Sequence, residues 1–149
     1  MSFFGAADVS VSGLTAQRLR MDLIAENIAN VETTRTQDGS PYKRKTLLFQ
    51  ERGSAVPFAD FFNKAMGGKV QDTRGVRVTR IVEDNRPGSR VYDPGHPDAD
   101  ADGYVTKPNV NIVEEMVNMI SAARSYEANV TALNTTKAMI AKTIEIGSR

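Results

Sequence analysis

Residues 112–146 read IVEEMVNMISAARSYEANVTALNTTKAMIAKTIEI, and this stretch decides the fold. Its seam residues follow one another at alternating spacings of three and four, which places them along one side of an α-helix. We predict a helix ~52 Å long over this stretch. Asn111 and Glu114 form a capping-box-like pair at its start, and Gly147 is suited to end it. The seam consists of Ile112, Met116, Met119, Ala123, Tyr126, Val130, Leu133, Lys137, Ile140 and Ile144.

The other end of the chain carries the same spacing, and it predicts a second helix over about residues 4–31. Because a narrow apolar seam is best covered by another seam, we expect the two terminal helices to pair as a coiled-coil-like stalk. The seam residues of the N-terminal helix are Leu14, Gln17, Met21, Ile24, Ile28 and Val31.

Both helices also carry a second apolar flank beside the seam. A pair of helices cannot cover both stripes, so the extra flanks predict contacts with further subunits in an array that need not close. The flank residues are Leu19 and Leu23 in the first helix and Val113, Val117 and Ile120 in the second.

Asn27 and Asn30 are unusual residues within the predicted N-terminal helix. Asparagine is a poor helix former that favours caps and C′ positions, so Asn30 is suited to terminating the helix. Alternatively, both amides hydrogen-bond across an interface and fix the register between subunits, as a buried asparagine does in coiled coils. The sequence leaves both interpretations open.

The middle of the chain, residues 32–107, lacks the helical spacing and is rich in Gly, Pro, Asp and Arg. Strands are predicted at residues 46–49 and 76–82, with 91–92 as the hairpin mate of the latter. A short helix ending at Met66 would place Phe58, Phe61 and Phe62 on one face with that methionine. The predicted fold is mainly α, with long terminal helices and a small, irregular, β-containing middle. Its three parts are residues 1–31 and 108–149, which form the helices of a core stalk, and the middle segment 32–107.

Composition excludes several classes of function. The 19 basic and 18 acidic residues nearly cancel, which argues against nucleic-acid or anionic-membrane binding. There is no cysteine, the single histidine, His96, has no partnered nucleophile, and no phosphate-binding glycine motif follows a strand. The first residues lack a basic segment before an apolar one, so no cleavable signal or membrane span is expected. We therefore expect neither an enzyme nor a bound cofactor.

An acidic loop extends from Asp93 to Asp102. Residues 98–103, DADADG, match the first six positions of an EF-hand loop, with Gly103 at the turn. The twelfth position is Asn109, where a bidentate glutamate is required, and Pro97 stands where a flanking helix should end. We therefore favour an exposed acidic turn that contacts a basic patch on a neighbour, and we expect no metal site.

Three motifs together resemble those of a known family. Residues 16–30, AQRLRMDLIAENIAN, resemble the N-terminal signature of the bacterial flagellar rod and hook axial proteins. Residues 108–119, PNVNIVEEMVNM, resemble the start of their C-terminal helix. The short middle with residues 92–105, YDPGHPDADADGYV, is similar to the proximal-rod members of the basal body in particular. The resemblance covers nearly the whole chain.

This resemblance implies a structural subunit of the flagellar basal-body rod, the helical drive shaft that crosses the periplasm and transmits motor torque. It implies copies of the same chain and other rod proteins as partners. It also implies export through the flagellar type III apparatus without a cleaved signal, and terminal helices that surround the export channel. A cytosolic coiled-coil adaptor that forms a closed oligomer is the alternative, and the doubled apolar flanks favour the open polymer over it.

Overall fold

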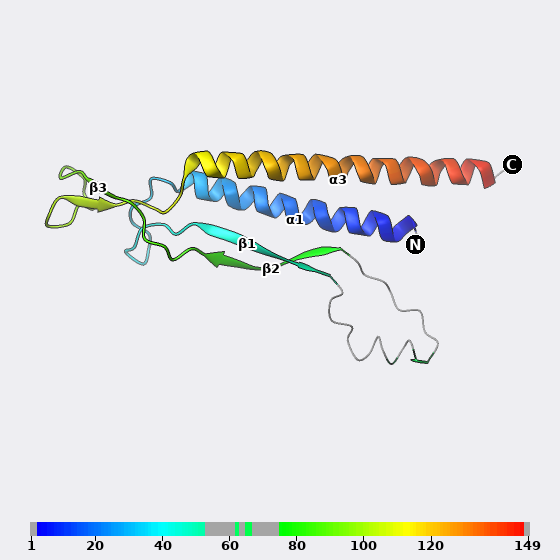
Figure 1. Ribbon diagram of the computed structural model, residues 1–149, viewed down its shortest axis with the longest axis horizontal. Helices are drawn as coiled ribbons and strands as arrows, with labels where there is room; N and C mark the ends of the chain where they lie inside the picture. Colours follow the sequence, from blue (N-terminus) through cyan, green and yellow to red (C-terminus); the bar gives the residue numbers. More distant parts are fainter. Residues whose placement is uncertain (1–2, 53–61, 63–64, 67–74, 148–149) are drawn as a thin grey trace. The chain divides into compact units, whose positions relative to one another are not determined.

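The computed structural model describes residues 3–52, 62, 65–66 and 75–147, and two long helices come from opposite ends of this chain (Figure 1). The first, α1, spans Phe3–Ala29, and the second, α3, spans Ile112–Gly147. Between them lie β1 (Lys45–Glu51), β2 (Val76–Glu83), β3 (Arg90–Tyr92) and β4 (Tyr104–Thr106). The prediction of a mainly helical chain with a small strand-containing middle is confirmed. Neither long helix, over its described residues, is apolar enough along its length to cross a membrane.

The helix ends follow from local chemistry. At the start of α3, Asn111 Oδ1 accepts the N–H groups of Val113 and Glu114 at 3.0 and 3.4 Å. These N–H groups have no partner inside the helix, so the Asn111 side chain stabilises its first turn. At the end of α1, the N–H and the Nδ2 of Asn30 both donate to the carbonyl of Glu26, at 3.1 and 2.9 Å. Of the two interpretations of Asn30, the structure supports that of a helix terminator.

The chain divides into two compact units. The first contains Met1–Arg18, Phe49–Thr79 and Arg124–Arg149, and the second contains Leu19–Leu48 and Arg80–Ala123. Each unit therefore contains a part of both long helices and a part of the two-stranded sheet formed by β1 and β2.

In the first unit, α1 approaches α3 closely at Gly13. A Cβ atom added at Gly13 would lie 2.9 Å from Oδ1 and 3.1 Å from Cγ of Asn129, so only glycine allows this approach without a shift. On another side of α1, Ser12 Oγ accepts the N–H of Val76 at 3.0 Å and ties the helix to the start of β2. In the first unit, the Asn129 side chain therefore packs directly against α1 at Gly13, and a side-chain to backbone hydrogen bond ties α1 to β2.

In the second unit, the buried apolar residues are few. Ala122 of α3 is fully buried, and Leu23 and Ile24 of α1 are nearly so. The other buried apolar side chains of this unit belong to the segments that pack on the helices, namely Tyr42, Leu47 and Val105. A core this small leaves room for polar groups to decide how the segments fit together.

The hairpin predicted between residues 76–82 and 91–92 is wrong. β2 pairs with β1, and β3 pairs with β4 in antiparallel register, with Val91 opposite Val105 and Tyr92 opposite Tyr104. The acidic loop makes this turn, because Asp100 accepts the N–H groups of Asp102 and Tyr104, and Gly103 takes a positive φ of 80°. The turn signal at residues 85–88 therefore redirects the chain from one sheet to the next.

The short helix predicted over residues 58–66 lies mostly outside the described residues. Within them, the Met66 N–H donates to the carbonyl of Phe62 at 3.0 Å, which is one helical turn. Phe62 and Met66 are both exposed, so the described part of this segment does not form the buried stripe that we expected.

Candidate functional site

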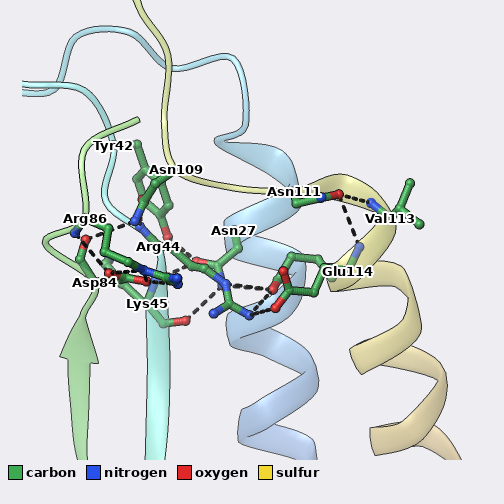
Figure 2. A network of polar contacts seen from close by, with 11 residues as sticks. Asn27, Tyr42, Arg44, Lys45, Asp84, Arg86, Asn109, Asn111, Val113 and Glu114 are labelled. Atoms are coloured by element: carbon green, nitrogen blue, oxygen red, sulfur yellow. Dashed lines mark hydrogen bonds and ion pairs between the residues drawn. The ribbon is translucent and has the colours of Figure 1, made fainter. Parts of the chain in front are cut away.

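Asn27, near the end of α1, is the centre of a buried polar network in the second unit (Figure 2). Its Nδ2 donates to the carbonyl of Lys45 at 2.9 Å and to Glu115 Oε2 at 3.0 Å. Its Oδ1 accepts the N–H of Lys45 and the hydroxyl of Tyr42, both at 2.9 Å. All four hydrogen-bonding positions of the amide are therefore filled within the chain. The interpretation of Asn27 as a hydrogen-bonding residue between subunits does not fit this geometry.

Glu115, in the first turns of α3, is 1 % exposed and is one of the two most buried large side chains of the described residues. Its Oε1 accepts hydrogen bonds from Arg44 Nε at 2.9 Å and from Arg44 Nη2 at 2.6 Å. Its Oε2 accepts the hydrogen bond from Asn27. A carboxylate can be buried at tolerable cost only when it is paired and hydrogen-bonded in this way.

Arg44 reaches Glu115 from a backbone that is itself held in place. Its N–H donates to Asn109 Oδ1 at 3.0 Å, and its carbonyl accepts the N–H of Asp84 at 2.8 Å. Asn109 Nδ2 in turn donates to the carbonyl of Asp84 at 3.2 Å. Hydrogen bonding by Arg86 lowers the pKa of the Asp84 carboxyl to about 2, so this end of the network stays ionised at neutral pH. Figure 2 shows these segments meeting beside the start of α3.

Tyr42 completes the network on the strand side. Burial raises the pKa of its hydroxyl to about 12, and the negative charges of Glu26 and Glu115 act in the same direction. The hydroxyl therefore stays protonated and remains a donor to Asn27 at physiological pH. The network joins the end of α1, the residues at the start of β1, the end of β2 and the start of α3.

At the start of α3, the side of the helix away from Glu115 is apolar and exposed. Val113 is 71 % exposed and Val117 is 61 % exposed, although both have apolar side chains. We call these residues and their neighbours the outer face of α3, which consists of Ile112, Val113, Met116, Val117 and Ile120. A contiguous exposed apolar patch on a helix is typical of a surface that another chain covers.

The predicted seam residues fall into three groups. Ile24 and Asn27 are buried, whereas Ile112, Met116 and Ile144 are exposed. The remaining seam residues are half-buried, namely Leu14, Gln17, Met21, Ile28, Asn30, Val31, Met119, Ala123, Tyr126, Val130, Leu133 and Ile140. The most buried positions of α3 recur every seven residues and are small or polar, namely Glu115, Ala122 and Thr136 with the half-buried Asn129 between them.

Sequence reasoning missed Tyr42, Arg44, Asn109 and Glu115. The only signal for Glu115 was its spacing, since it lies one helical turn before the seam residue Met119. That signal is weak, because a glutamate in the first turn of a helix is usually a solvated residue that complements the helix dipole.

The acidic loop offers its carboxylates to donors of the same chain. Asp98 accepts the hydroxyl of Thr34 at 2.8 Å and pairs with Arg35, and Asp100 pairs with Arg90 at 2.6 Å. Hydrogen bonds to these groups lower the pKa of both Asp98 and Asp100. Among the described residues, no group of three or more His, Cys, Asp or Glu side chains is placed to hold a metal ion.

Comparison of the chain with known protein families identifies the class of protein to which it belongs. The family described as "Flagella basal body rod protein" matches residues 8–36, and the family described as "Flagellar basal body rod FlgEFG protein C-terminal" matches residues 101–146. These matches cover most of α1 and of α3. The chain is thus a flagellar rod-type protein that carries both terminal motifs of that class.

The relatives narrow the class to one family. The chain is 47 % identical to the flagellar basal-body rod protein FlgC of Bacillus subtilis, with 99 % of each chain covered. It is 46 % identical to FlgC of Borreliella burgdorferi over 98 % of each chain, and 43 % identical to FlgC of Escherichia coli O157:H7 over 99 % of each chain. The chain belongs to the flagellar basal-body rod protein FlgC family. It is a structural subunit of the rod in the flagellar basal body, and the alternative of a cytosolic adaptor is not supported.

Proposed function

We propose that this chain joins the rod by covering the exposed faces of its terminal helices with those of neighbouring subunits. The neighbours are copies of the chain and other rod proteins, and the product is the helical shaft that transmits motor torque and surrounds the export channel. The observation that carries this proposal is the outer face of α3, where five apolar side chains at the start of one helix are each at least 44 % exposed.

The physical reason is the cost of leaving such a face in water. Each buried CH₂ group contributes about 0.8 kcal/mol, so covering these five side chains favours the contact between subunits. The first unit carries a second exposed set on α3, formed by Met139, Ile144 and Ile146. Apolar sets at different places on one chain favour contacts between unlike surfaces, and such contacts generate open helical assemblies.

The proposed assembly surface combines the predicted seam residues that remain exposed or half-buried with the outer face. Asn27 contributes indirectly, by holding the chain's own segments together. The proposed organisation remains an N-terminal helix at residues 1–31, a middle segment at 32–107 and a C-terminal helix at 108–149, with both helices in the core stalk.

Two further parts of the proposal concern how the chain acts. We propose that it reaches the rod through the flagellar type III export apparatus, for which the rod location of the family is the support. We also propose that it acts as a structural subunit without catalysis, and the structural character of the family supports this.

A charge placed on the outer face tests the proposal. Val117→Asp should prevent assembly, because an unpaired carboxylate buried in an apolar contact costs several kcal/mol. The matched control is Gln37→Asp, which adds the same charge at an exposed position of the middle segment, outside both terminal helices. Both variants are expressed in the source bacterium lacking its own copy, and swarming and the yield of hook–basal bodies are measured.

We expect the control to restore motility and Val117→Asp to fail. Circular dichroism of both purified chains shows whether the helices are kept. Normal motility with Val117→Asp would contradict the proposed surface, and failure of the unmodified chain to restore motility would contradict the rod function itself.

A further inference from the structure

We infer that the buried set of Asn27, Arg44 and Glu115 fixes the register between α1 and α3, and so positions the outer face of α3 for assembly. This inference rests on the proposed function of the outer face. It assigns these three residues a role in specifying one alignment of the helices rather than in adding stability.

Apolar packing alone does not define this alignment. In the second unit, the buried apolar side chains of the two helices are Leu23, Ile24 and Ala122, and the alanine is too small to interlock with a neighbour. A slip of one helix by one turn, about 5.4 Å, would exchange these contacts for similar ones. The few apolar side chains buried between the helices therefore leave several registers close in energy.

The polar set removes that ambiguity because its atoms have fixed partners. A slip by one turn would take Glu115 away from Arg44 and leave a buried carboxylate without a cation. Asn27 would lose an acceptor as well, because its Nδ2 donates to Glu115 and its other bonds hold it to Lys45 and Tyr42. One buried polar residue is known to select register in helical assemblies at some expense of stability.

Arg44 does not follow a sliding α3, because its carbonyl accepts the N–H of Asp84, just after β2. Its N–H donates to Asn109 Oδ1, and Asn109 lies three residues before α3, so a slip of the helix would break this bond as well. The guanidinium therefore acts as a fixed reference point beside α3, and only one position of Glu115 along that reference satisfies it.

The consequence for assembly follows from the position of Glu115 in the helix. It lies within two residues of Val113, Met116 and Val117, so any slip or rotation that moves Glu115 also moves the outer face. Neighbouring subunits that must meet this face at a defined place would find it displaced by a turn. A chain with a relaxed register would therefore fold and still fail to assemble.

The test replaces the charged pair by apolar residues of similar volume in Arg44→Met/Glu115→Met. Exchanging a buried ion pair for packed apolar side chains is often neutral or stabilising, although here one N–H of Asn27 also loses its acceptor. The midpoint of thermal unfolding should therefore fall by less than about 8 °C. Motility and hook–basal-body yield should nevertheless be lost. The matched control is Glu32→Met/Lys107→Met, which removes an exposed ion pair of the same unit, and it should keep both stability and motility.

A disulfide reports the register directly, because the chain has no cysteine of its own. A Cβ at residue 13 lies 3.1 Å from Asn129 Cγ, so Gly13→Cys/Asn129→Cys places two thiols within disulfide reach. Both helices are continuous through this region, so a one-turn slip carries the pair out of reach. Oxidation with diamide should cross-link the purified full chain efficiently, and the yield should fall about twofold or more in the Arg44→Met/Glu115→Met background as other registers become populated.

An unchanged cross-link yield together with normal motility in the Met/Met chain would overturn the inference. A fall in thermal midpoint of more than about 8 °C would also overturn it, since the set would then be needed for stability. These outcomes are independent of the proposed function, which is judged by whether the unmodified chain restores motility and whether Val117→Asp abolishes it.

Discussion

The two sides of the start of α3 differ in which kind of side chain is buried and which is exposed, and this difference indicates how the protein assembles. The side packed within the second unit holds a charged carboxylate, Glu115, whereas the outer face presents Val113, Met116 and Val117 to solvent. A protein that functions alone shows the opposite distribution, with apolar groups inside and charges outside. The difference indicates that the outer face is completed by another chain, while the inner side is organised by specific polar contacts.

The largest expected effect comes from breaking the inner side with Glu115→Ala. The change leaves one N–H of Asn27 without an acceptor and Arg44 with the exposed Glu114 as its remaining carboxylate partner, and breaking a buried pair in this way costs about 3–5 kcal/mol. Glu114→Ala is the control, because Glu114 is exposed and lies 3.4 Å from Arg44, so its loss should cost at most about 1 kcal/mol. Urea unfolding of both chains measures the difference. Equal losses of unfolding free energy would show that the buried carboxylate of Glu115 contributes no more to stability than the exposed carboxylate of Glu114.

The two sides also differ in how well the sequence predicts them. The long apolar spacing of residues 112–146 is a local property, so both α3 and its cap at Asn111 could be predicted from it. The burial of Glu115 could not, because it depends on Arg44, which lies 71 residues away in the chain. The β3–β4 hairpin was mispredicted because two turn signals compete, and the hydrogen bonds of Asp100 decide between them only in three dimensions.

A smaller effect, with a pH signature, is expected at Tyr42. Tyr42→Phe removes the hydroxyl that donates to Asn27 and should cost about 1 kcal/mol at neutral pH. Because the pKa of Tyr42 is raised to about 12 in the folded chain from 10.0, the folded state favours the protonated hydroxyl. The stability that this group contributes is complete below pH 10 and is lost as the pH rises from 10 toward 12.

The measurement is urea unfolding of the unmodified chain and of Tyr42→Phe at several pH values. The gap in unfolding free energy between them should close above pH 10. A gap that stays constant up to pH 12 would mean that the hydroxyl is not buried against carboxylates.

Both sides begin at the first turn of α3, which the Asn111 cap stabilises. Asn111→Ala removes the acceptor for the N–H groups of Val113 and Glu114, and it should cost about 1 kcal/mol. Asn111→Ser retains a capping oxygen and should recover most of that loss. Thermal unfolding of the two variants distinguishes the loss of the cap from a general sensitivity of this position to substitution.

The smallest effect on stability is expected on the outer face. Val117→Ser changes an exposed side chain and should alter the unfolding free energy by less than about 0.5 kcal/mol. Assembly should suffer nevertheless, because the lost apolar area is buried only between subunits. If Val117→Ser lost stability as well as assembly, the outer face would be needed for folding, which would contradict the distinction between the two sides of α3.

The most direct test of the assembly surface is photo-cross-linking in intact hook–basal bodies. A photoreactive amino acid is placed at Val117 in one strain and at the exposed Gln37 of the middle segment in another, and adducts are identified by mass spectrometry after irradiation. We expect strong adducts from position 117 to a second copy of the chain or to another rod protein. Incorporation of the chain into basal bodies without any adduct from position 117 would contradict it.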